Sequence, residues 1–247
     1  MRLLVLAAGM GTRLKPYTDN LNKSMIPIAG RPLLYHSLMQ CIRINPPLTE
    51  IVMVVGYRRE QIEQYFCSEF QGVPIRYVYQ ETLDGIAGAV ALAAPLLADE
   101  PFLMILGDEL LLEPNLPQMA NYFLSAHVDG LCGVLREKPL EEICKNYTLH
   151  LSADGSIDKV VEKPERPFND LLGLGYCIFS ASTLPFAAET PTCPIRKQRG
   201  MCEWITLCIE HGLRFYPYTA GKDAVNLNSR EELNWLRDAL SQGDLQE

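Results

Sequence analysis

The chain has 247 residues, of which 48% are hydrophobic and 21% are charged, a balance typical of a globular protein with a sizeable core. Its net charge of −8 argues against a nucleic-acid partner, and no apolar run approaches the about 18 residues of a membrane-spanning helix. Eight cysteines occur without a C-x-x-C pair, so neither a zinc nor a redox motif is present. We therefore expect a cytoplasmic protein with reduced thiols and no membrane partner.

Apolar, strand-like runs alternate with helical patterns in the first half of the chain. The spacing predicts strands at 3–8, 51–55, 75–79 and 102–106, and helices at 32–44, 58–66 and 85–97. This alternation indicates an α/β fold with a mainly parallel sheet.

The rhythm changes after residue 108. The pattern predicts a helix at 117–125, a strand at 130–136, a hairpin of 147–152 with 157–162 around an Asp-Gly turn, and a strand at 173–179. A helix at 203–211, short strands at 215–218 and 224–227, and a last helix that Ser229 and Glu232 begin as a capping box complete the chain. We expect these strands to extend the same sheet in a single domain, 1–240, followed by a frayed tail at 241–247.

The first strand runs directly into a glycine-containing turn, residues 9–13 (GMGTR). Its two glycines let backbone N–H groups approach a phosphate, and Arg13 and the later Lys23 supply positive charge, which together indicate a polyphosphate site. A dinucleotide-binding turn fits less well. Leu14 stands where the third small residue belongs, and residues 23–31 contain no carboxylate for a ribose.

Residues 6–14 (LAAGMGTRL) followed by residues 23–27 (KSMIP) resemble the signature of the sugar-nucleotidyltransferase family, the nucleotide-sugar pyrophosphorylases. The resemblance implies a Rossmann-like three-layer sandwich with a mainly parallel mixed sheet, the glycosyltransferase-A-like nucleotidyltransferase fold. It also implies a nucleotide-binding half, 1–110, and an acceptor-binding half, 111–240. The nucleotide-binding residues that it implies are Leu6, Ala8, Gly9, Gly11, Thr12, Arg13, Gln80 and Gly85.

The resemblance also assigns the catalytic residues, which are Arg13, Lys23 and Asp108. The arginine and the lysine flank the α-phosphate in the family. Asp108 follows the apolar strand 102–106, at the strand end where ligands of α/β sheets bind, and a carboxylate there can hold Mg²⁺. Asn226 stands where many members have a second aspartate, but some uridylyltransferases use asparagine there, so Asn226 is the expected second metal ligand.

The expected acceptor site lies in the second half. Residues 162–164 (EKP) resemble the family segment in which the acid binds sugar hydroxyls and the lysine pairs with the sugar phosphate, which implies Glu162 and Lys163. Tyr147 and Gly175 are the other implied contacts. Thr148 departs from the glycine usual in sugar-specific members, so we expect its side chain to occupy space near the acceptor.

These features together predict an Mg²⁺-dependent nucleotidyltransferase that acts on a nucleoside triphosphate and a phosphorylated small molecule, in the first place a sugar 1-phosphate. A cytidylyltransferase with a non-sugar acceptor, such as phosphocholine or a phosphonate, is one alternative. A catalytically inactive nucleotide-binding regulator is another, which Asn226 favours and the intact Arg13, Lys23 and Asp108 disfavour. The base, the acceptor, an allosteric site and a homo-oligomer all stay open at this point.

Overall fold

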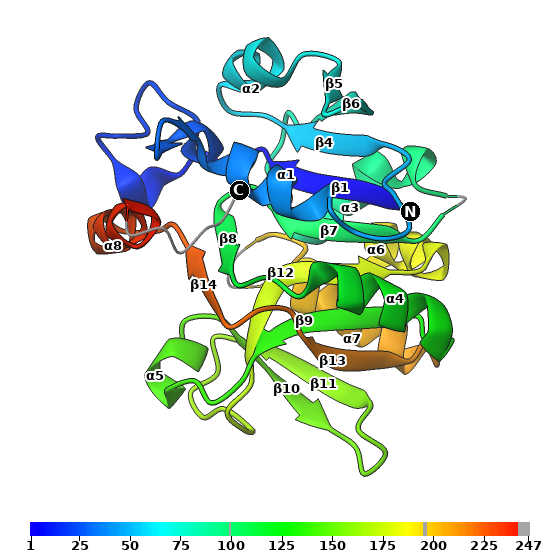
Figure 1. Cartoon of the computed structure of the whole chain (residues 1–247). Coiled ribbons are helices and arrows are strands. Elements are labelled where there is room, and N and C mark those ends of the chain that lie inside the picture. Colours follow the sequence, from blue (N-terminus) through cyan, green and yellow to red (C-terminus); the bar gives the residue numbers. More distant parts are fainter. Residues whose placement is uncertain (99, 195–196, 242–247) are drawn as a thin grey trace.

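The computed structural model describes residues 1–98, 100–194 and 197–241, and its centre is a ten-stranded mixed sheet (Figure 1). Four parallel strands form the first part of this sheet, in the spatial order β6 (Val73–Tyr79), β4 (Ile51–Val55), β1 (Arg2–Ala7) and β7 (Phe102–Leu106). The short β5 (Glu69–Phe70) pairs with β6 at the edge. The order places the first strand between the second and the fourth, as in a doubly wound nucleotide-binding sheet.

The second part of the sheet is mainly antiparallel. Its central strand, β12 (Leu172–Phe179), pairs with β7 and so joins the two parts. The remaining strands of this part are β9 (Gly130–Leu135), β10 (Tyr147–Leu151), β11 (Ile157–Glu162) and β13 (Phe215–Thr219). The expectation that the later strands extend the same sheet is therefore confirmed for these strands. It is wrong for the strand predicted at 224–227, which is β14 (Asp223–Asn226) and pairs with β8 (Glu109–Leu112) in a separate two-stranded sheet.

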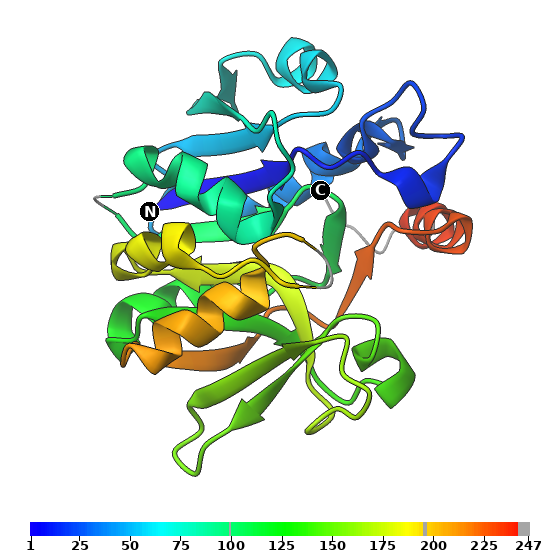
Figure 2. The same ribbon diagram turned by 180° about the vertical axis from the view of Figure 1, so that it is seen from behind.

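Helices cover both faces of the sheet, which gives the expected three layers. One face carries α1 (Leu33–Cys41), α2 (Arg59–Phe66) and α4 (Leu116–Ala126), whose apolar side chains pack in one core cluster. The other face, which Figure 2 shows in front, carries α3 (Gly85–Ala93), α6 (Leu184–Glu189) and α7 (Met201–Glu210). Among the described residues, no helix has the length and the apolar character to cross a bilayer.

A third, smaller core lies beside the sheet and joins segments that are distant in sequence. It contains the hairpin of β2 (Pro27–Ile28) and β3 (Arg31–Pro32), the pair of β8 (Glu109–Leu112) and β14 (Asp223–Asn226), and α8 (Arg230–Ser241). Leu14, which follows the glycine turn, is buried in it at 1% exposure. Figure 1 shows α8 next to this N-terminal segment.

The predicted helices and strands are present, with boundaries that differ by a few residues. The helix predicted at 85–97 ends at Ala93 and continues as a 3₁₀ turn, Ala94–Leu96, which contains a proline. The predicted hairpin has a longer loop than its Asp-Gly pair requires, since Ser152 N donates to Ser156 O. The sequence did not indicate the short elements β2, β3, β5, β8, α5 (Leu140–Ile143) and α6. Of the predicted frayed tail, residues 242–247 lie outside the described residues.

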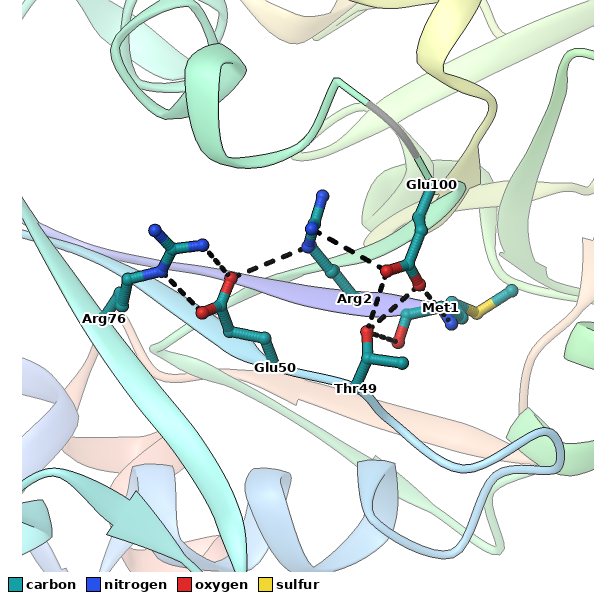
Figure 3. Close-up of polar contacts among 6 residues, drawn as sticks. All are labelled: Met1, Arg2, Thr49, Glu50, Arg76 and Glu100. Carbon is teal, nitrogen blue, oxygen red and sulfur yellow. Dashed lines mark hydrogen bonds and ion pairs between the residues drawn. The ribbon is translucent and has the colours of Figure 1, made fainter.

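Ion pairs tie the amino ends of the parallel strands together (Figure 3). Glu50, before β4, accepts two hydrogen bonds from Arg76 of β6, at 2.5 and 2.8 Å, and lies 3.5 Å from Arg2 Nε of β1. Glu100, before β7, binds the ammonium of Met1 at 2.9 Å, and this hydrogen bond lowers the pKa of its carboxyl. These charged residues therefore stabilise the sheet at its amino end. The candidate site residues lie at the opposite, carboxyl ends of the strands.

Candidate active site

The glycine turn and Asp108 meet where the strand order of the parallel sheet reverses. The turn follows β1, and Gly107 and Asp108 follow the neighbouring β7, so both lie at the carboxyl ends of adjacent strands. The chain leaves β1 toward β4 on one side and reaches β7 on the other, so the strand order reverses here. In open α/β sheets ligands bind at such a point.

The glycine turn presents unused backbone donors. None of the N–H groups from Gly9 to Arg13, Thr12 included, donates a hydrogen bond to another residue in the described part of the chain. Gly11 has a φ of +61°, and a Cβ there would lie 3.0 Å from Lys23 Cβ, so the turn requires glycine at this position. Arg13 is exposed and forms no ion pair with a described residue. Such a row of amides beside a cation suits phosphate oxygens.

Leu6 and Ala8 frame the start of this turn. Leu6 is half-buried in β1 next to β7, and Gly107 N donates to its carbonyl at 2.9 Å. The carbonyl of Ala8 accepts from Tyr57 N at 3.2 Å, which fixes the turn against the end of β4. Both residues therefore lie at the strand end, as expected for the floor of a nucleotide site.

The segment expected to read the base is held by contacts that the sequence did not reveal. Gln80 is 5% exposed, and its side-chain amide donates to Gly85 O at 3.4 Å. A Cβ on Gly85 would lie 2.3 Å from Arg199 O, so glycine is required here for the close approach of that backbone. The Arg199 guanidinium also pairs with Asp84 Oδ2 at 2.5 Å. The segment before α7 thus closes directly over the start of α3.

Lys23 begins a 3₁₀ turn, Lys23–Met25, and its side chain contacts Asp108. Asn22 fixes this turn, because its side-chain nitrogen donates to Ala7 O at 3.2 Å and to Tyr57 O at 2.7 Å. The Lys23 side chain is 10% exposed, and its Nζ lies 2.5 Å from Asp108 Oδ2. The ion pair brings the predicted lysine and the predicted metal ligand into direct contact.

Asn226 is carried to the same place by the pairing of β14 with β8. Asn226 lies opposite Glu109 in this pair, and Leu227 N donates to Asp108 O at 2.9 Å. Asn228 links the groups, because it accepts from Lys23 Nζ at 2.9 Å and donates to Asn226 Oδ1 at 2.8 Å. One polar chain thus connects Asp108 to Asn226.

The carboxylate of Asp108 and the amide oxygen of Asn226 are the oxygen donors that Mg²⁺ prefers. Among the described residues, no group of three or more His, Cys, Asp or Glu side chains is placed to hold a metal ion. A cation at this place would therefore take part of its coordination shell from substrate phosphates and water. That arrangement is usual for Mg²⁺, which takes one or two protein ligands in phosphate sites.

Residues from both halves of the chain line a single cavity of about 390 Å³. The predicted site residues on its wall are Arg13, Gly85, Asp108, Tyr147, Glu162, Lys163, Gly175 and Asn226. It adjoins a second cavity of about 810 Å³ that reaches Trp235 of α8 and shares Arg13, Lys163 and Asn226 with it. The structure thus brings the predicted metal and acceptor residues together with Arg13. The predicted residues that do not line these two walls are Leu6, Ala8, Gly9, Gly11, Thr12, Lys23 and Gln80.

Tyr147 and Thr148 are adjacent in β10, but only Tyr147 lines the cavity. Tyr147 lines the cavity, but its hydroxyl donates to Leu174 O at 3.0 Å and burial raises the pKa of this phenol. The expectation that Thr148 occupies space near the acceptor is wrong. Thr148 is completely buried, its hydroxyl accepts from Phe168 N at 3.3 Å, and it is not among the residues that line the cavity.

Glu109 directly follows Asp108 and is a residue of the site that the sequence analysis did not identify. It is 3% exposed, its Oε2 accepts from Gly175 N at 2.7 Å, and it lines both cavities. Burial raises the pKa of this carboxyl to about 8. The one signal in the sequence is a charged residue at the head of an apolar run, 109–112, which becomes β8.

The family model that is described as nucleotidyl transferase matches residues 2–223. The chain belongs to this family. The match confirms the resemblance that residues 6–14 and 23–27 carry, and it extends through both halves of the chain.

Curated relatives in the nucleotidyl transferase family include a UTP–glucose-1-phosphate uridylyltransferase, AglF, of Haloferax volcanii, which is 34% identical over 181 residues, 73% of this chain and 72% of the relative. The bifunctional protein GlmU of Methanocaldococcus jannaschii is 30% identical over 77% of this chain and 42% of its own length. A glucose-1-phosphate thymidylyltransferase of Streptomyces antibioticus is 28% identical over 73% of this chain and 49% of its own length. The chain thus spans about half the length of the last two relatives.

Solved structures show the same fold as this family member. A UDP-glucose pyrophosphorylase complexed with UDP-glucose superposes with a TM-score of 0.86 at 22% identity, over 98% of each chain. An apo UDP-glucose pyrophosphorylase gives 0.85 at 21% identity, over 99% of this chain and 100% of that one. The predicted three-layer nucleotidyltransferase fold is therefore confirmed.

Proposed function

We propose that the protein transfers a nucleoside monophosphate from a nucleoside triphosphate to a sugar 1-phosphate, with Mg²⁺, giving a nucleoside-diphosphate sugar and pyrophosphate. The observation that carries this proposal is the single cavity on which Arg13, Asp108 and Asn226 face Glu162 and Lys163. The curated relatives named as uridylyl- and thymidylyltransferases of glucose 1-phosphate support it. An enzyme that uses these substrates is expected in the cytoplasm.

In this reaction a phosphate oxygen of the acceptor attacks the α-phosphorus in line, and pyrophosphate leaves. Residues 1–110 supply the amides of the glycine turn together with Arg13 and Lys23, which neutralise charge on the triphosphate. Residues 111–240 supply Glu162 for sugar hydroxyls and Lys163 for the sugar phosphate. Because little covalent chemistry falls to the protein, fixed positions and fixed charges account for the rate.

The metal is assigned to Asp108 and Asn226. When bound, Mg²⁺ would supply positive charge that offsets the negative charge of the substrate phosphates. The residues of this chain orient that charge, because Asp108 is fixed by its main-chain bond to Leu227 and Asn226 by Asn228. Thr148 is completely buried and does not line the cavity, which supports a sugar acceptor.

The test measures pyrophosphate release with ATP, GTP, CTP, UTP and dTTP against several hexose 1-phosphates, phosphocholine and an aminoalkylphosphonate. We expect release that depends on one sugar phosphate and on Mg²⁺. Lys23→Met should lower kcat by roughly 10²–10³-fold, as for other preorganised electrostatic groups. Lys159→Met, at an exposed position of β11, is the matched control and should keep the wild-type rate.

Release with a non-sugar acceptor only would reassign the protein to cytidylyltransferase-like chemistry. Nucleotide binding without release for any acceptor would favour the inactive regulator. Equal rates for Lys23→Met and Lys159→Met would refute the role of Lys23.

A further inference from the structure

Asn228 is a residue of the site to which the proposed reaction gives no contact with a substrate. It follows the end of β14 by two positions, it is half-buried, and it lines both cavities together with Asn226. Its main-chain N–H donates to Glu232 Oε2 at 2.5 Å, in the first turn of α8. The backbone at Asn228 is therefore held without the help of its side chain.

The side-chain amide of Asn228 uses both of its ends. Its Oδ1 accepts from Lys23 Nζ at 2.9 Å. Its Nδ2 donates to Asn226 Oδ1 at 2.8 Å and to Asn226 O at 3.2 Å. Because an ammonium group only donates, Lys23 determines that the oxygen of the Asn228 amide faces it. The NH₂ end of the same amide then faces Asn226.

The direction of these hydrogen bonds matters because the side chain of Asn226 is itself an amide. A half turn about its last bond would exchange its oxygen and its NH₂ group, and of these two only the oxygen suits Mg²⁺. The donor from Asn228 favours the orientation in which the oxygen of Asn226 lies at the end of the hydrogen-bonded row that leads to Asp108. This oxygen has two lone pairs, so one remains for a metal ion. An aspartate would need no such selection, because both of its ends are oxygens.

We propose that Asn228 is a positioning residue that makes an asparagine effective as a metal ligand, because it receives a hydrogen bond from Lys23 and donates one to Asn226 Oδ1. The inference rests on the proposed function, in which the metal binds together with the nucleoside triphosphate. Lys23 Nζ carries three hydrogens, so it can keep its bond to Asn228 while it also binds a phosphate. The orientation of Asn226 is thereby retained when the substrate enters.

The experiment measures nucleotide binding instead of turnover. The probe is the tightest-binding of the α,β-methylene analogues of ATP, GTP, CTP, UTP and dTTP, titrated by calorimetry with no acceptor present. Its Kd is measured with saturating Mg²⁺ and again in EDTA, and the ratio of the EDTA value to the Mg²⁺ value reports what the metal contributes. The Kd in EDTA shows separately whether the glycine turn and Lys23 still bind the phosphates.

The proteins compared are wild type, Asn228→Leu, Asn226→Asp and the double variant. Leucine has nearly the shape of asparagine but neither a donor nor an acceptor. We expect Asn228→Leu to lower the ratio by roughly tenfold or more, the loss typical when a group that orients a metal ligand is removed. With Asp at position 226 the same substitution should change the ratio by less than about twofold, because a carboxylate presents an oxygen in either orientation. Asn121→Leu, at an exposed position on α4, is the control and should keep the wild-type ratio.

An equal loss with Asn and with Asp at position 226 would overturn this inference and leave the proposed function intact, since Asn228 would then not act through the orientation of Asn226. A wild-type Kd that does not respond to Mg²⁺ would overturn it as well. If the wild type releases no pyrophosphate with any acceptor while the four ratios are as expected, the proposed function is refuted and the role of Asn228 is supported. If Asn228→Leu does not fold, as judged by its thermal unfolding, Asn228→Ala takes its place with the same expectations.

Discussion

Leu14→Ala should weaken the third core and thereby test whether this core positions the nucleotide-binding residues. Leu14 is 1% exposed, directly follows Arg13, and packs in the cluster that also holds Val225 and Leu227 on either side of Asn226. The substitution removes three buried carbon atoms, which is worth about 2.4 kcal/mol at about 0.8 kcal/mol each. With the cavity that is left, we expect a loss of about 3–4 kcal/mol in the free energy of unfolding.

The kinetic effect follows from the position of Leu14. If the weakened core makes nucleotide binding at the glycine turn less favourable by about 1.4 kcal/mol, KM for the nucleotide rises about tenfold. Leu97→Ala is the matched control, because Leu97 is 0% exposed but packs in the separate core beneath α3, α6 and α7. Urea denaturation gives both stabilities, and initial rates of pyrophosphate release give both KM values at a temperature where each variant is folded. Equal KM values for the two variants would show that the third core does not position the site.

Three further predictions concern single positions of the site. Gly11→Ala forces a Cβ to 3.0 Å from Lys23 Cβ at a φ of +61°, so urea denaturation should show a loss of about 1–2 kcal/mol and kinetics a higher KM for the nucleotide. Asn226→Asp adds a carboxylate to the metal site, so half-maximal activity should need less Mg²⁺, and an unchanged Mg²⁺ titration would contradict the assignment. Thr148→Val removes a buried hydrogen bond and should cost about 1 kcal/mol in stability. It should not change the relative kcat/KM for different sugar phosphates, since Thr148 does not line the cavity.

The local sequence predicted the main helices and strands because their signals are local. The strands β4 and β7 are apolar throughout, and β1 is apolar after Arg2, since helices cover both faces of the sheet. Such runs stand out without any alignment. The glycine turn also carries its own signal, because the positive φ of Gly11 favours glycine. In the same way the capping box was confirmed, as Ser229 N donates to Glu232 Oε2 at 2.7 Å.

The remaining parts of the site depend on contacts between distant segments. Asn228 reaches Lys23 only because β14 pairs with β8, a strand that the sequence did not indicate. Arg199 packs its backbone against Gly85 and pairs with Asp84, although it lies 115 positions after Asp84 in the sequence. Glu109 was not recognised because a glutamate before three leucines is equally compatible with an exposed strand end. Burial of that kind is set by tertiary packing, which local propensity does not encode.

The contact between Lys23 and Asp108 has a consequence for the order of binding. On the proposed mechanism the two groups part, since Lys23 is assigned to the phosphates and Asp108 to the metal. Mg²⁺ alone would displace the lysine from Asp108 and leave a side chain that is only 10% exposed without a counter-charge. The triphosphate alone would bring further negative charge toward Asp108. Only the metal and the nucleotide together give each group a new partner of opposite charge, so we infer that they enter the site as one complex.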